Sequence, residues 1–269
     1  MASFRGRSFI YNDIMSDMFG LEIISFETGG TTSIATSERE IVESYLPRRH
    51  RSVFYGVDHT EPLVFNLVAG SCRPLSVQIQ SGINRWLIGQ NRYAPLRIVQ
   101  DDMEEYFYNA LITNLEYTSF GNFAFAINAT VHCDSPYAWT LPKLHSGLFN
   151  YRDAVKIMTV YNDSDVLGFI YPDLDITLNT SQTKSLQIRN NTIGDDNESS
   201  FNIDNMSTTY PKIEVDGTNR IIKSSDPNFK LNDFNKRWVR LAPGNNQLQF
   251  IGGVTRAVVQ FVSPKLIGG

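Results

Sequence analysis

The sequence is poor in several features that mark common classes of protein. Cys72 and Cys133 are the only cysteines in 269 residues, and residues 1–136 contain no lysine. No apolar run approaches the ~20 residues needed to span a bilayer, and the N-terminus lacks the apolar stretch of a secretory signal. We therefore expect a protein without membrane spans or secretion, whose two cysteines are free thiols rather than a bridge.

Motifs that carry enzyme chemistry are also missing. There is no Gly-x-Ser-x-Gly turn, phosphate-binding loop, Cys-x-x-Cys or His-Glu-x-x-His. His132 and Cys133 are adjacent, so on a strand they would point to opposite faces and could not share a metal. The sequence predicts a protein that is not an enzyme, with no catalytic residues, no metal site and no cofactor.

Three weaker hypotheses about chemically active residues remain as alternatives to that prediction. Cys133 and His145 could form a nucleophile–base pair, although they are two residues picked from six candidates. The run Asp195–Glu198 could hold Ca²⁺, but it lacks the alternating ligand spacing and is more typical of a solvated loop. Asp173 and Asp175 would project from one strand face about 7 Å apart, as in a glycosidase, or simply be surface charges.

The charge is divided unevenly along the chain. Residues 1–136 hold ten Arg and fifteen acidic residues, whereas residues 137–269 hold fourteen basic and thirteen acidic residues. A nucleic-acid-binding protein should show a basic patch or stripe, and neither half does. Plentiful aromatic residues and asparagine instead favour a β-rich protein with many turns.

The most ordered pattern lies between residues 74 and 133. A helix is expected over about 74–88, beginning at Pro74 and ending before Gly89. Apolar residues at spacings of three and four would share one face of it: Leu75, Ile79, Ile83, Trp86 and Leu87.

The residues after the helix predict strands. A strand is expected over 95–99, then a turn at Asp101-Asp102, then a long strand from Tyr106 in which Tyr106 and Tyr108 lie on one face. This strand is either buried on both faces or paired at an interface. Residues 122–132 would form the next strand and pair with 111–117.

The N-terminal segment has weaker signals. Strands are expected at 9–12 and 19–24, strand-like pieces at 33–36 and 40–45, and turns around GGTTS and YGVDHTEP. Between the strand-like pieces and the second turn, residues 46–51 read Leu-Pro-Arg-Arg-His-Arg and should be exposed.

The second half reads as short strands separated by Asn, Asp, Gly and Pro. The expected strands are 155–161, 173–178, 186–189, 200–203, 213–215, 221–223, 238–241, 247–251 and 257–262, with a turn at 243–246. Such spacing predicts an antiparallel β-sandwich. A change from Lys-free to Lys-containing sequence places a domain boundary near Pro136, giving domains 1–136 and 137–269.

The stretch GINRWLIGQNRYAPLRIVQDDMEEYFYNALI, with PLVFNLVAGS before it, resembles the distal tail (Dit) proteins of long non-contractile-tailed bacteriophages. The resemblance implies a mainly β chain: an N-terminal β domain with one packed helix, then a galectin-like or jelly-roll-like sandwich. It implies a structural virion component, assembled in the host cytoplasm, in which six copies form a ring at the distal end of the tail.

The same resemblance implies the partners and the interface. The partners would be further copies of the chain, the tail tube protein, a tail-associated hub and receptor-binding proteins, while DNA passes through the lumen without specific binding. In the family, a hairpin at the position of residues 46–51 reaches the neighbouring subunit. We therefore expect interface residues at Arg48, Arg49, Arg51, Tyr106 and Tyr108.

A second functional class is kept as an alternative. The second domain could bind a host-surface glycan, because sugars stack on aromatic faces in lectin-like sandwiches. The available aromatic residues are Trp139, Tyr151, Tyr161, Tyr171 and Trp238, of which Trp238 is the one expected in the core.

Overall fold

The computed structural model describes residues 7–24, 39–59, 61–150, 152–153, 155–179, 185–196, 199–207 and 209–267. The chain divides into two compact units, residues 1–141 with 265–269, and residues 142–264. The first unit therefore extends five residues beyond the expected boundary near Pro136 and also takes back the C-terminal end of the chain. Each unit has its own hydrophobic core.

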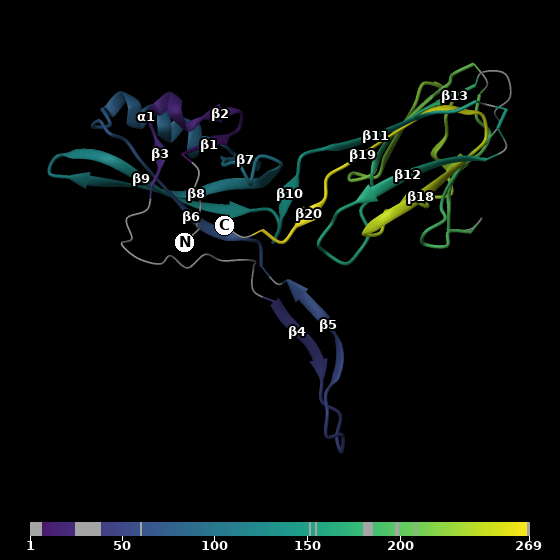
Figure 1. Ribbon diagram of the computed structural model, residues 1–269, viewed down its shortest axis with the longest axis horizontal. Coiled ribbons are helices and arrows are strands. Elements are labelled where there is room, and N and C mark those ends of the chain that lie inside the picture. Colours follow the sequence, from purple (N-terminus) through teal and green to yellow (C-terminus); the bar gives the residue numbers. More distant parts are fainter. Residues whose placement is uncertain are drawn as a thin grey trace. The chain divides into compact units, whose positions relative to one another are not determined.

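A nine-stranded sheet forms the body of the first unit (Figure 1). Seven strands follow the order β2-β1-β7-β8-β9-β6-β3, while β10 pairs with β8 and β20 pairs with β10. Their bounds are β1 Ser8–Tyr11, β2 Ile14–Met15, β3 Glu22–Ile23, β6 Val64–Gly70, β7 Ala94–Val99, β8 Tyr106–Phe120, β9 Phe123–Cys133, β10 Ala138–Thr140 and β20 Pro264–Lys265.

The expected hairpin is present at the centre of this sheet. Strands β8 and β9 pair from Ala110↔Cys133 to Phe120↔Phe123, closed by the turn at Gly121, whose φ of 62° lies in the left-handed region that glycine adopts most easily. The face that carries Tyr108, Ala110 and Ile112 is buried. The alternating pattern was thus a correct guide to both strands.

Helix α1 (Val77–Leu87) begins later than expected from Pro74. Ser76 is the N-cap, and its hydroxyl oxygen accepts from the amide of Ile79 at 3.4 Å, which satisfies one of the free amides of the first turn. Ile83, Trp86 and Leu87 are buried as expected, but Ile79 is 37% exposed and lies at the edge of the buried stripe.

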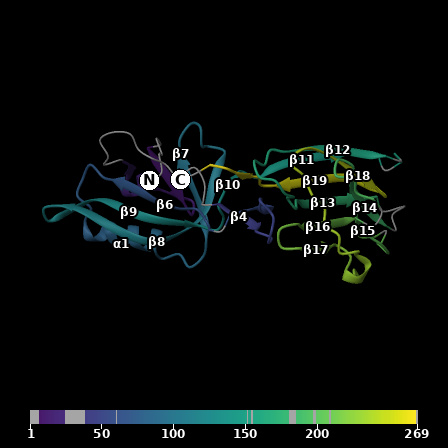
Figure 2. The same ribbon diagram turned by 90° about the horizontal axis from the view of Figure 1, so that it is seen from below.

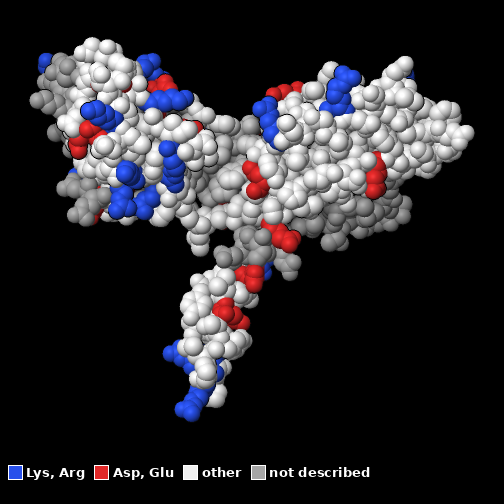
Figure 3. All heavy atoms as spheres, turned by 180° about the vertical axis from the view of Figure 1, so that it is seen from behind, with Lys and Arg blue, Asp and Glu red and all other residues white. Residues whose placement is uncertain are grey.

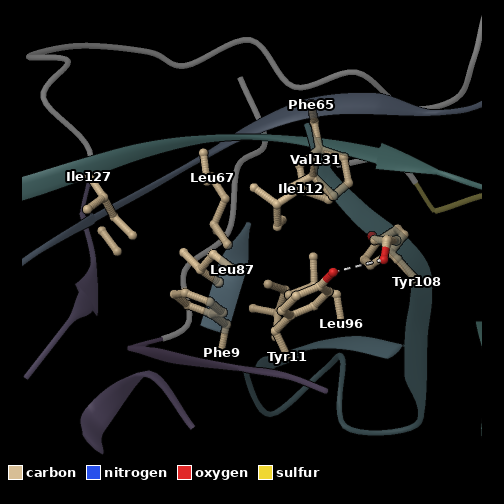
Figure 4. Close-up of a cluster of buried hydrophobic side chains, with 14 of the residues drawn as sticks. Phe9, Tyr11, Phe65, Leu67, Leu87, Leu96, Tyr108, Ile112, Ile127 and Val131 are labelled. Atoms are coloured by element: carbon tan, nitrogen blue, oxygen red, sulfur yellow. Dashed lines mark hydrogen bonds between the residues drawn. The ribbon is translucent and has the colours of Figure 1, made fainter. Parts of the chain in front are cut away.

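The helix packs on the sheet through aromatic side chains. Trp86 stacks between Phe9, at a ring distance of 5.4 Å, and Phe19, at 5.0 Å. Figure 4 shows Phe9, Tyr11, Leu87 and Leu96 pointing toward Leu67, Ile112 and Val131 within this core. Phe19 ends the short 3-10 helix η1 (Ser16–Phe19), so the strand expected over 19–24 is reduced to β3.

Strands β4 (Arg39–Ser44) and β5 (Val53–His59) form a two-stranded sheet of their own. The turn expected from YGVDHTEP is wrong for residues 55–59, which belong to β5 and pair with β4 from Arg39↔His59 to Ser44↔Val53. The strand-like piece expected at 33–36 lies outside the described residues. We refer to residues 39–59 as the arm.

The second unit is an antiparallel sandwich, as expected. One sheet has the order β11-β19-β13-β16-β17 and the other β12-β18-β14-β15, and Figure 2 shows the strands of each sheet side by side. Their bounds are β11 Lys143–Leu148, β12 Lys156–Asn162, β13 Asp173–Leu178, β14 Leu186–Asn190, β15 Phe201–Ile203, β16 Lys212–Asp216, β17 Ile221–Ser224, β18 Gly244–Ile251 and β19 Val254–Phe261; a 3-10 helix, η2, covers Leu231–Asp233.

Two expectations for the second unit are wrong. Residues 238–241 form no strand and make only an isolated bridge between Leu241 and Ile170. Residues 244–246 are not a turn but the start of β18, which pairs with β12 from Asn162↔Gly244. The last two expected strands, 247–251 and 257–262, are present as β18 and β19, which lie in different sheets.

Buried asparagines explain the conformation around residue 241. Asn246 accepts from the amide of Ala242 at 2.9 Å and donates to the carbonyl of Ala242 at 2.7 Å. Asn190 donates to the carbonyl of Arg240 at 2.7 Å, and Asn162 donates to that of Ala242 at 3.1 Å. Side-chain amides therefore satisfy main-chain groups that a neighbouring strand would otherwise pair.

Candidate assembly surfaces

The arm exposes large apolar side chains along both strands. Seven described residues contribute: Ile41, Val42, Tyr45, Leu46, Phe54, Tyr55 and Val57, with exposed fractions from 40% to 76%. Ile41 and Val57 are direct cross-strand partners, so they form one continuous apolar patch. A two-stranded hairpin is at best marginally stable in water without a face to bury, which makes this arm a candidate for contact with another surface.

Positive charge is gathered at the closed end of the arm (Figure 3). Arg48, Arg49 and Arg51 are all exposed, as the sequence predicted for this segment. The amide of Arg49 donates to the carbonyl of Leu46 at 3.1 Å, and Arg48 has a φ of 68°, which closes the turn. Among the described residues, none of these three side chains forms an ion pair within the chain.

The two tyrosines expected at an interface lie in different surroundings. Tyr108 is 1% exposed and packs edge-on against Phe65 at 5.3 Å, and this burial raises the pKa of its hydroxyl well above the ordinary value. Its side chain belongs to the core of the single chain, so we do not retain it as an interface residue. Tyr106 is half-buried and pairs with Thr140 of β10.

An apolar hollow of about 470 Å³ lies beside the tip of the β8–β9 hairpin, near β3, the end of β6 and the start of β9. Its lining consists of Glu22, Ile24, Gly70, Ser71, Cys72, Phe120, Phe125 and Ala126. Phe120 is 64% exposed, and the rings of Phe120 and Phe125 meet edge-on at 6.3 Å. This surface was not predicted from the sequence, because its lining comes from segments that are far apart in the chain.

A smaller hollow of about 230 Å³ lies on the second unit, over β13, β16 and β17. Asp175 and Glu214 line it as direct cross-strand partners, and Lys223 lies opposite Glu214. Asp173, also in the lining, accepts from the amide of Gly217 at 2.8 Å. The carboxylate of Asp175 also lies 3.8 Å from the guanidinium of Arg256, so positive groups offset the like charges of this pair.

The aromatic residues considered for sugar stacking are mostly engaged in internal contacts. Trp238 packs against the core and meets Phe234 at 5.1 Å, as expected. The Arg220 guanidinium lies 3.4 Å from the ring centre of Tyr171, and the indole nitrogen of Trp139 donates to Ser135 at 3.1 Å. Tyr161 is 54% exposed, and Tyr151 lies outside the described residues.

The residues considered for calcium binding and for catalysis also have structural roles. Asp195 forms an ion pair with Arg240 at 2.8 Å, with 5% of its side chain exposed, rather than lying in a solvated loop. Cys133 is buried, and this burial, followed by the charge of Asp134, raises the pKa of its thiol to about 12. At neutral pH that thiol is protonated, which is unsuited to nucleophilic attack. Within the described residues, no helix is long and apolar enough to cross a membrane.

Comparisons with known proteins agree with this architecture. Residues 4–135 match a family described as phage tail protein N-terminal domain, and residues 137–262 match its phage tail C-terminal domain. No curated protein matches the sequence.

Two solved structures share the fold. The Dit protein of phage SPP1, described as a paradigm of the hub adsorption apparatus in phages that infect Gram-positive bacteria, has a TM-score of 0.67 at 10% identity, over 95% of this chain and 98% of that one. A chain of the phage P2 baseplate in its activated conformation with Ca has a TM-score of 0.55 at 9% identity, over 98% of this chain and 100% of that one. The resemblance to distal tail proteins is thus confirmed in fold, and the chain belongs to a family of phage tail proteins.

Proposed function

We propose that this protein is the distal tail protein of a phage and that six copies assemble into a ring at the end of the tail. The ring would join the tail tube to the tail-associated hub and to any receptor-binding proteins. The first unit would build the ring and its lumen, and the second unit would form a peripheral module. The protein acts as a structural part, assembled in the host cytoplasm before it enters the virion.

The arm is the observation that carries this proposal. It buries neither face within the described chain, exposes seven large apolar side chains, and ends in an Arg-rich turn. A guanidinium makes forked pairs with carboxylates, so Arg48, Arg49 and Arg51 suit an acidic neighbouring surface. An arm of this kind fits a head-to-tail contact in which each copy both gives and receives, and such contacts form a ring when the rotation between copies closes.

The charge of the first unit also fits a channel for DNA. Residues 1–136 hold an excess of acidic over basic residues. A negative wall repels the phosphate backbone instead of holding it, so DNA would slide past without specific binding.

Native mass measurement tests the proposal directly. Light scattering or mass photometry of the full chain over a range of concentrations should show a species of six copies, and negative-stain images should show rings. An arm-less variant, with residues 40–58 replaced by a short Gly-Ser linker, should stay monomeric while it keeps the β content of both units. A strict monomer at every concentration, alone and with the tail tube protein, would overturn the proposed ring.

Glycan binding by the second unit is the alternative function, and the smaller hollow favours it. Asp175 and Glu214 offer acceptors for sugar hydroxyls, and Lys223 offers a donor in the same hollow. A glycan array with the full chain, repeated with the Glu214→Ala variant, would support this function if a signal is found and then lost. An array without any signal would contradict glycan binding and leave the tail-tip role as the only proposed function.

A further inference from the structure

We propose that the apolar hollow beside the β8–β9 tip is the docking surface for the arm of a second copy of this chain. The arm face that carries Ile41 and Val57 would lie against Phe120 and Phe125. This inference rests on the proposed ring and adds to it the place where each arm is received.

The first support is that both surfaces are left uncovered. On the arm, Ile41 is 60% exposed and Val57 is 42% exposed. Beside the hollow, Phe120 is 64% exposed and Phe123 is 60% exposed. Burying apolar surface contributes about 25 cal/mol for each Å² removed from water, so joining two such patches favours association.

The second support is the shape of the hollow. Gly70 has no side chain, which allows Ile24 to lie directly against the end of β6, where it lines the hollow together with Ala126. The volume of about 470 Å³ is enough for two or three aliphatic side chains of the arm. A stable subunit interface buries roughly 800 Å² on each partner, so the hollow would hold the apolar centre of a wider contact.

The third support is complementary charge. Residues 45–52 contain three Arg and no acidic residue. Glu22 lines the hollow and is exposed. An arm that enters with its apolar face down can bring its basic end toward this carboxylate, which favours one direction of docking.

A native cysteine makes the inference directly testable. Cys72 lines the hollow and is exposed, while Cys133 is buried, so the folded chain carries one accessible thiol and it marks the docking surface. The full-length Ile41→Cys variant would be treated with a short bismaleimide and separated on a denaturing gel. We expect a ladder of dimers and higher species, because every chain both gives and receives an arm.

Three matched variants make the result specific. Glu40→Cys places the thiol one residue earlier, on the opposite face of β4, and should give no ladder. Ile41→Cys combined with Cys72→Ser should lose the ladder, which excludes links between two arms. Leu167→Cys, 95% exposed on the second unit, should give no ladder and controls for random collision.

The possible outcomes distinguish a failure of the proposed docking surface from a failure of the proposed ring. Six-copy species that give no Cys72-dependent ladder would overturn the docking surface and leave the proposed function standing. A ladder that stops at dimers would support the docking and overturn the closed ring. A link within one chain would show that the arm covers its own hollow, and a monomer without any link would overturn both proposals.

A second variant avoids any dependence on cross-linking. Phe120→Ser removes an exposed ring, so the fold should be unaffected and the native mass should shift toward single chains. Leu148→Ser, 83% exposed on β11, is the control and should leave the native mass unchanged. An unchanged ring population in Phe120→Ser would contradict a role for this hollow.

Discussion

The indole nitrogen of Trp86 donates a hydrogen bond of 2.8 Å to the main-chain carbonyl of Tyr11, 75 residues earlier in the chain. This bond ties α1 to β1, on the side of the sheet where Phe9 and Phe19 stack against the same indole. It links two segments that the sequence keeps far apart.

Loss of this bond should weaken the first unit measurably. We expect Trp86→Phe to keep most of the stacking but to cost about 1–3 kcal/mol, because the carbonyl of Tyr11 loses a buried partner. Trp86→Ala should cost more, about 3–5 kcal/mol, since it also leaves a cavity. Urea unfolding followed by circular dichroism measures both values. Val77→Ala, on the same helix at 80% exposure, should change little.

The buried asparagines predict a similar cost in the second unit. Asn246 is 0% exposed, and its side chain contacts Ala242, Gly244 and Asn190. We expect Asn246→Ala to destabilise the unit by about 2 kcal/mol, because several partly buried main-chain groups and the buried Asn190 side chain lose their partners together. Asn245→Ala, at the neighbouring exposed position, is the control. Equal unfolding midpoints for the two variants would contradict this account.

Alkaline pH should weaken the first unit through Cys133. Its thiol has an ordinary pKa of 9.0, and burial raises the pKa to about 12 in the folded chain. The folded chain therefore binds this proton more tightly than the unfolded chain, so the contribution to stability is complete below pH 9.0 and is lost as the pH rises toward 12. Urea midpoints should fall between pH 9 and 10.5, less steeply in Cys133→Ala. Cys72→Ala should follow the wild type.

Removing the arginines at the end of the arm should weaken assembly without unfolding the monomer. We expect Arg48→Asn with Arg49→Ser to raise the protein concentration needed for rings, because charge pairs at the contact are lost, and Asn tolerates the left-handed backbone at position 48. Mass photometry at a series of concentrations measures the shift. Arg92→Ser, which removes one exposed charge outside the arm, should behave as wild type. Rings of unchanged stability would rule out a role for these arginines.

The sequence was a good guide where a strand buries one face. Asp173–Leu178 was expected and observed with the same bounds, because Leu174, Ile176 and Leu178 alternate with polar residues. The β8–β9 hairpin was recoverable for the same reason. The fold class and the sandwich followed from such elements.

The sequence was a poor guide where a segment buries no face in a core, or where side chains bind its main chain in place of a neighbouring strand. Strand β5 was read as a turn because Gly56 and Asp58 interrupt its pattern, and the arm has no core to impose one. Residues 238–241 looked like a strand, yet Asn162, Asn190 and Asn246 bind their main chain instead of a neighbouring strand. The hollow beside Phe120 joins residues from four separate segments, which no local pattern can bring together.

The return of the chain end to the first unit has a consequence for how such proteins can change. Strand β20 pairs with β10, and Ile267 packs against the core of the first unit. The whole second unit is thus an insertion between two adjacent strands. A different module could be exchanged at this point in a single genetic event, with the first unit left intact. Strand β20 and Ile267 therefore help to hold the first unit together, so removing them should destabilise the first unit, although the second unit directly precedes them in the sequence.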